Sequence, residues 1–149
     1  MPLTEQIAAD LKDAMRQRDG RRRDVLRLTL AALHNAEIAA HDTLDEAAVA
    51  EVLAREAKRR RESIEAFGKA GRQDLVEKEE AELAVLLPYL PTQLSREEIT
   101  DAARQVIQET GASGPKELGK VMPVLMEQFR GRADGRTVSE VVRELLAGS

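Results

Sequence analysis

The residues of this sequence best suited to bind an anion are cations that lie beside glycines in its last third. Gly119, Gly131 and Gly135 would let a backbone approach a phosphate closely, and helix N-termini offer free N–H groups to anions. This part of the chain therefore offers a candidate phosphate-binding surface, although its 8 basic and 9 acidic residues mean that it is not basic overall. Five cations would form it, and we call them the tail cations: Lys116, Lys120, Arg130, Arg132 and Arg136.

A second group of cations surrounds the first expected turn of the chain. Six arginines lie between positions 16 and 27 and are opposed only by Asp19 and Asp24. This local excess of positive charge could meet an anionic surface, and it could equally be a hydrated loop. For a second RNA contact we select Arg22 and Arg23.

Overall charge and composition restrict how RNA could be bound. The net charge is -4, so the field of the whole protein repels a polyanion and only a local patch can attract one. The tail holds one aromatic residue, Phe129, and we expect it to be buried. Base stacking is therefore not available, and the shape and backbone of the RNA would have to be read.

Other chemistry is poorly represented. The chain has no cysteine, which excludes disulfides and thiolate metal sites, and His34 and His41 lack a metal-ligand spacing. No phosphate-binding loop, dinucleotide fingerprint or nucleophile motif occurs. We therefore expect no catalytic centre, no cofactor and no metal. No apolar run reaches the roughly 20 residues of a membrane span, and residues 1–10 do not resemble a signal peptide, so we predict a cytoplasmic protein.

The elements that must position these residues are all helical. Ala, Leu, Glu and Arg dominate, and apolar residues recur at helical spacing over 4–18, 22–40, 43–70 and 73–87. Pro88 and Pro91 then interrupt the pattern. We predict an all-α protein with an N-terminal domain of about four helices, residues 1–93, and a three-helix tail domain, residues 94–149.

Local signals place several helix ends. Thr4 is a candidate N-cap, and residues that begin at Thr43, Ser95 and Thr137 each have the pattern of a capping box. Pro123 falls inside the second tail helix and removes the donor that the Gly119 carbonyl would normally receive. A kink or a break is expected there.

Arg60 falls on the apolar stripe of the third expected helix. A guanidinium in that position needs a carboxylate or carbonyl partner, because an unpaired buried charge costs several kcal/mol. We predict that Arg60 is at least half buried and is held by an acidic residue of the next helix, with a structural role favoured over ligand binding. The candidate partners are Glu79, Glu80 and Glu82.

Short motifs follow one another along nearly the whole chain. They are DLKDAM at 10–15, LRL at 26–28, Arg60 with ESIEAF at 62–67, AGRQDL at 70–75, YLPTQLS at 89–95, GKVM at 119–122 and GRADG at 131–135. In this order they resemble the YqeY family, free-standing relatives of the C-terminal part of the GatB and GatE amidotransferase subunits. One departure is Pro123, where relatives tend to have glycine.

The resemblance implies an N-terminal helical domain and a three-helix tail. In the amidotransferases, related segments hold the body of the tRNA, and ATP-dependent transfer of ammonia from glutamine occurs in a separate region that this chain does not match. We therefore expect a module that binds tRNA, or a larger tRNA-processing or amidotransferase enzyme, without catalysing the reaction alone. If this chain were labelled a carbon–nitrogen ligase with glutamine as amido-N-donor, the label would reflect its common descent with the amidotransferases. Two alternatives stay open, a protein–protein adaptor and an accessory subunit of a glutamine-dependent amidotransferase.

Overall fold

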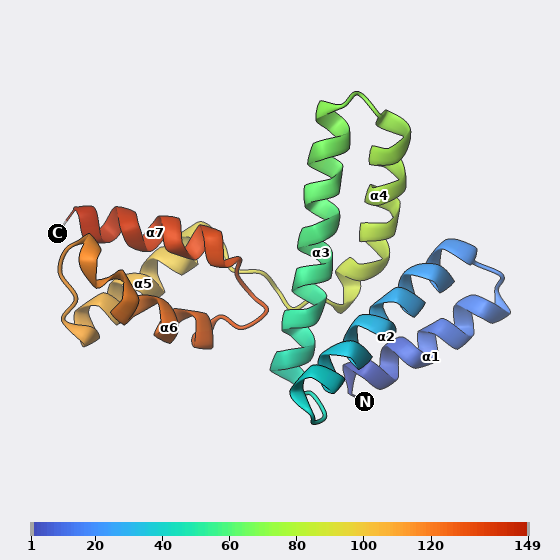
Figure 1. The fold of residues 1–149 in the computed structure, drawn as a ribbon, viewed down its shortest axis with the longest axis horizontal. Coiled ribbons are helices and arrows are strands. Elements are labelled where there is room, and N and C mark those ends of the chain that lie inside the picture. The colour runs from blue at the N-terminus through green and yellow to red at the C-terminus, as the bar shows by residue number, and fades with distance from the viewer. Residues whose placement is uncertain (1, 149) are drawn as a thin grey trace. The chain divides into compact units, whose positions relative to one another are not determined.

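The structure is a computed structural model that describes residues 2–148, and it confirms the all-α fold. Helices, turns and loops make up the described residues, with no β-strand among them (Figure 1). The chain divides into two compact units between Leu90 and Pro91, three residues before the expected boundary. Residues 91–93 belong to the second unit because Thr92 and Gln93 form hydrogen bonds with residues 131–132 of that unit.

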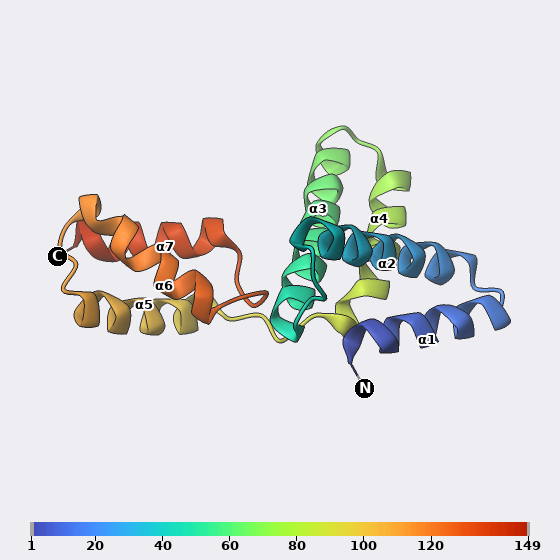
Figure 2. The same cartoon turned by 60° about the horizontal axis from the view of Figure 1, so that its bottom comes forward.

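The first unit consists of two antiparallel helical hairpins. Helices α1 (Leu3–Arg16) and α2 (Gly20–Ala40) lie side by side, as do α3 (Glu46–Lys69) and α4 (Gln73–Leu86), in both Figure 1 and Figure 2. A single 3-10 turn, η1 (Leu87–Tyr89), ends the unit. Helix α2 packs against both helices of the second hairpin, so the two hairpins share one core. Its buried residues are Ile7, Leu26, Leu33, Val49, Val52 and Leu53.

The second unit is a bundle of three short helices. They are α5 (Arg96–Thr110), α6 (Leu118–Gln128) and α7 (Gly135–Ala147), with a 3-10 turn, η2 (Pro115–Glu117), directly before α6. Each helix packs against the other two. Phe129 is buried in their core as expected, together with Ile99, Ala103, Val106, Val121, Leu125, Val138, Val141, Val142 and Leu146.

Of the three expected capping boxes, the one at Ser95 is confirmed, and those at Thr43 and Thr137 are wrong. The Ser95 hydroxyl accepts a hydrogen bond from the Glu98 N–H, and the Glu98 carboxylate accepts one from the Ser95 N–H. At the start of α3, however, the Asp45 carboxylate accepts from the Ala48 N–H at 2.7 Å, and Thr43 lies outside the helix. Aspartate caps a helix as well as threonine does, so two cap formers this close cannot be ranked from local sequence.

Two other helix starts also differ from expectation. Helix α7 begins at Gly135 with Asp134 as its N-cap, so Thr137 lies inside the helix. Helix α1 begins at Leu3 after Pro2, so Thr4 is a helical residue and not the cap. Helix α6 also continues through Pro123 without a break. Gly119, whose carbonyl loses a partner there, is exposed, and water can hydrate that carbonyl.

The prediction for Arg60 is confirmed. Its side chain is 13 % exposed, and its Nη1 donates to Glu79 at 3.2 Å and to Glu82. Both carboxylates come from α4 and are themselves mostly buried. The three charges therefore tie α3 to α4 at a point where the apolar stripes of the two helices meet.

We expect Arg60→Ala to lower the free energy of unfolding of the first unit by about 2–3 kcal/mol, because it leaves two mostly buried carboxylates without a cation. Arg59→Ala is the matched control. That side chain is 74 % exposed and pairs with Glu56 at 3.7 Å, so its removal should cost less than about 0.5 kcal/mol. Urea denaturation followed by circular dichroism measures both. Equal effects of the two variants would contradict the assignment.

The start of α3 allows a second test. Asp45→Ala should destabilise the first unit by about 1 kcal/mol, since the Ala48 N–H then loses its acceptor. Thr43→Ala should leave the stability within about 0.3 kcal/mol of the parent, because exposed residues outside a cap have little effect. The reverse order of the two effects would show that threonine is the cap.

Candidate functional site

The five tail cations lie in two groups, one at each end of α6. Lys116 is in η2 and Lys120 is in the first turn of α6, and we call them the lysine pair. Arg130 and Arg132 follow the end of α6, and Arg136 begins α7; we call them the arginine turn. Helix α6 has 11 residues and is therefore about 16 Å long. The two groups therefore lie at opposite ends of this helix.

Several tail cations already have a carboxylate beside them. Lys120 pairs with Glu117 at 2.7 Å, and the ammonium lowers the pKa of that carboxyl. Arg136 pairs with Glu140 at 3.6 Å, but its side chain remains 83 % exposed. Ion pairs this exposed contribute little and are easily exchanged. A phosphate could therefore replace Glu140 as the partner of Arg136.

Two segments that lie about 40 residues apart meet at the arginine turn. Gln93 donates through Nε2 to the Gly131 carbonyl at 2.9 Å, and the Leu94 N–H donates to the Arg132 carbonyl at 2.9 Å. Arg132 donates in return through Nε to the Thr92 carbonyl at 3.2 Å. We call these contacts the clasp. Gly131 has φ 73°, a left-handed conformation that favours glycine, so the turn depends on this residue.

The clasp restricts the position of the Arg132 side chain. Its Nε is bound to the Thr92 carbonyl, and the residue is nevertheless exposed. The two terminal nitrogens make no hydrogen bond with the part of the chain that the structure describes. The Glu98 carboxylate lies within range of this charge, since hydrogen bonds with Ser95 and, after them, the charge of Arg132 lower the pKa of Glu98. An incoming anion would therefore compete with Glu98 for these nitrogens. The guanidinium is planar and suits two oxygens of one phosphate. Among the tail cations, Arg132 thus combines a held position with available donors.

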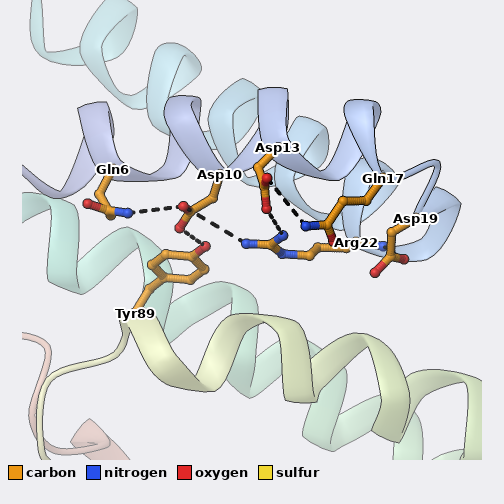
Figure 3. Close-up of polar contacts among 7 residues, drawn as sticks. All are labelled: Gln6, Asp10, Asp13, Gln17, Asp19, Arg22 and Tyr89. Carbon is orange, nitrogen blue, oxygen red and sulfur yellow. Dashed lines mark hydrogen bonds and ion pairs between the residues drawn. The ribbon is translucent and has the colours of Figure 1, made fainter.

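The two arginines predicted as a second contact lie in different surroundings. Arg22 donates through Nη1 to Asp13 at 3.0 Å and lies 3.9 Å from Asp10 (Figure 3). The hydrogen bond to Asp13 raises the pKa of Arg22. Arg23 pairs with its neighbour Asp24 and remains exposed to a larger extent. The guanidinium of Arg22 is therefore engaged within the protein, and that of Arg23 is more exposed but is paired with Asp24 at 3.0 Å.

Tyr89, in η1 at the end of the first unit, also contacts one of the carboxylates around Arg22. Its hydroxyl donates to Asp10 at 2.5 Å, which links η1 to α1 (Figure 3). Burial, with the hydrogen bond to Asp10 and the charge of Asp10, raises the pKa of Tyr89 to about 12. The hydroxyl stays protonated at neutral pH and keeps donating. In this way α1, α2 and the end of the first unit are held by one polar network.

No role of Tyr89, Asp10 or Asp13 could be predicted from local sequence. Tyr89 and Asp10 are 79 residues apart, so no helical spacing connects them. Their only shared signal is that both belong to motifs that resemble the YqeY family. Likewise, Gln93 and Gly131 of the clasp lie in two separate motifs of that resemblance, 38 residues apart.

The structure offers two further observations on candidate sites. Within residues 2–148, no group of three or more His, Asp or Glu side chains is placed to hold a metal ion. None of the helices in that range is both long enough and apolar enough to cross a bilayer.

Comparisons with known proteins agree with the motifs. The family described as Yqey-like protein matches residues 4–146. A protein of Pyrenophora tritici-repentis named "Altered inheritance of mitochondria protein 41, mitochondrial" is 33 % identical over 144 residues, which are 94 % of this chain and 78 % of the relative. The protein of the same name from Kluyveromyces lactis is 35 % identical over 136 residues, which are 89 % of this chain and 69 % of the relative.

These names overturn the cytoplasmic location expected from the sequence, since both relatives, and a third from Eremothecium gossypii, are named as mitochondrial proteins. The expectation was wrong because the absence of an apolar span and of a secretory signal separates membrane and secreted proteins from the rest. It does not distinguish one aqueous compartment from another.

The family match covers almost all of the described chain, including the motifs that form the clasp and the Tyr89 network. The relatives from Pyrenophora tritici-repentis and Kluyveromyces lactis also align over most of the chain. The chain therefore belongs to the Yqey-like protein family.

Proposed function

We propose that this chain is a tRNA-binding module and that the arginine turn of its second unit makes the main contact. The observation that carries the proposal is the geometry of Arg132. The clasp holds its Nε, while the residue is exposed and makes no other side-chain hydrogen bond within residues 2–148, although its charge also acts on the Glu98 carboxylate. Arg130, which lies 4.0 Å from Glu127, follows α6, and Arg136 lies in the first turn of α7; both add positive charge beside Arg132.

The chemistry of the second unit favours the RNA backbone over the bases. Phe129 is 4 % exposed, so the unit has no aromatic surface on which bases could stack. Arginines on a rigid turn suit phosphates, and folded RNA presents phosphates in a fixed shape. The choice of tRNA rests on the resemblance of the tail segments to those that hold the body of the tRNA in the amidotransferases.

We expect the affinity to be modest. Three phosphate contacts would make the binding constant fall with salt concentration at a logarithmic slope of about -2 to -3. The net charge of -4 opposes binding at long range. The lysine pair, about 16 Å away along α6, would be a second contact for a folded RNA larger than that distance. Arg22 is not expected to contact the RNA, because its guanidinium donates to Asp13.

We assign no bond-forming step to this chain alone. The carboxylates in the most connected polar cluster, Asp10 and Asp13, are held by Arg22 and Tyr89 and are engaged as structural acceptors. A larger tRNA-processing or amidotransferase enzyme would supply the chemistry if the chain acts with one.

A first experiment tests this last point. The purified chain, incubated with glutamine and ATP and with a mischarged aminoacyl-tRNA, should release no ammonia and form no amidated product above the background without protein. Turnover that depends on the chain would contradict the proposal and would establish the alternative of a glutamine-dependent amidotransferase subunit.

A second experiment tests the arginine turn. Arg132→Ala should weaken tRNA affinity by about three- to tenfold and reduce the magnitude of the salt slope by about 1, because one phosphate contact is lost. Fluorescence anisotropy with labelled tRNA at several salt concentrations measures both quantities.

Two control variants separate charge from structure. Arg104→Ala removes the same charge from the exposed surface of α5, where Arg104 faces Asp101 at 3.9 Å, and should leave the salt slope unchanged. Gln93→Ala weakens the clasp without altering charge and should also leave the slope unchanged. If all three variants behave alike, the arginine turn is not the contact.

A further inference from the structure

An apolar row on α2 is left open to solvent in the first unit. Leu28 is 61 % exposed and Ile38 is 59 % exposed. With Ala31 and Asn35 they recur at intervals of three and four residues, so they lie along one side of the helix. Two large aliphatic side chains in one exposed row are more than the scattered apolar residues of an ordinary surface.

A groove of about 640 Å³ runs beside this row, between α2 and α3. Its aliphatic part, which we call the floor, consists of Leu28, the small residues Ala32 and Ala36 of α2, and Val52 of α3. Small side chains leave room for another helix to approach closely. The groove therefore has the size of a site that receives a helix, with aliphatic side chains mainly on the side of α2 and charged side chains on the side of α3.

The exposed charges along the groove are positive. Arg55 and Arg59 are both exposed and lie one helical turn apart on the rim formed by α3. The carboxylates of the groove are less accessible, because Glu56 pairs with Arg59 and Glu79 pairs with Arg60, and both are mostly buried. An occupant would thus meet an apolar floor and a rim of guanidinium groups.

We propose that this groove binds an amphipathic helix of a partner protein whose apolar face is flanked by Glu or Asp. Alkyl side chains on the floor bury the apolar face, and the arginines of the rim pair with the acidic flank. The lining has no aromatic group on which a base could stack, and its aliphatic side chains favour the apolar face of a helix, although the arginines of the rim can also donate to a phosphate. The groove and the arginine turn consist of different residues in different units, so this inference stands apart from the proposed function.

The test uses two labelled synthetic helices with the same Leu/Ala stripe, one flanked by Glu and the other by Lys. The full chain should bind the acidic helix at least tenfold more tightly, by fluorescence anisotropy. In NMR spectra of the full chain, the shifted amides should lie within residues 28–38 and 52–63. Equal binding of the two helices, no binding, or shifts elsewhere would overturn the proposal.

Variants of exposed residues separate the floor from the rim. Leu28→Glu should abolish binding of the acidic helix, whereas Val124→Glu, at a half-exposed position of α6, should not change it. The double variant Arg55→Glu, Arg59→Glu should reverse the preference toward the basic helix. Arg61→Glu is its control, because residue 61 is exposed and points away from residue 59 on α3.

Two further outcomes identify a different occupant. Light scattering should show the same mass for the parent and for Leu28→Glu. A dimer that this substitution dissociates would overturn the proposal in favour of a second copy of the chain. If tRNA displaces the acidic helix from the parent, and if the direct binding of tRNA is lost in the double arginine variant but kept in Arg132→Ala, the occupant is RNA and the proposal is overturned.

Discussion

Arginines that lie between helices hold the first unit together. Arg60 joins α3 to α4 through two carboxylates, and Arg22 joins α2 to α1 through Asp13 and Asp10. Tyr89 extends the second network to the end of the unit. A guanidinium removed from water needs such partners, and with them it fixes how the helices face one another. The core consists mainly of Leu, Val, Ile and Ala, whose contacts carry little directional information. The contacts between arginines and carboxylates therefore add the orientation of the helices relative to one another.

The same requirement divides the cations of the protein into two kinds. Arg60 and Arg22 satisfy carboxylates inside the first unit and have little capacity left for a ligand. Arg132 is tied through one nitrogen and offers two others, whereas Arg55 stands exposed beside an apolar groove. The two surfaces proposed here follow from this division. One presents charge on a rigid turn, and its binding would weaken with salt. The other combines alkyl groups with a charged rim, so part of its affinity would persist at high salt.

Features that depend on a few neighbouring residues could be predicted from the sequence. The helical content, the capping box at Ser95 and the interruption near Pro88 and Pro91 are of this kind, because periodicity, caps and proline act over one or two turns. The burial of Arg60 was also predictable, since its position on an apolar stripe requires a buried partner. The start of α3 was not, because Thr43 and Asp45 are both good caps two residues apart and only the packed helix selects between them.

The sequence by itself thus determined that this protein is helical, where the chain breaks and that one arginine must be paired. Only the tertiary structure decided which distant residues meet, such as Tyr89 with Asp10 and Gln93 with Gly131. It also decided that α6 separates the tail cations into two groups and that Arg22 is engaged within the protein. The physical reason is the distance along the chain over which each interaction acts. A helix is specified by patterns within a few residues. The pairing of distant side chains depends on how the helices pack, and that packing depends on all of their faces together.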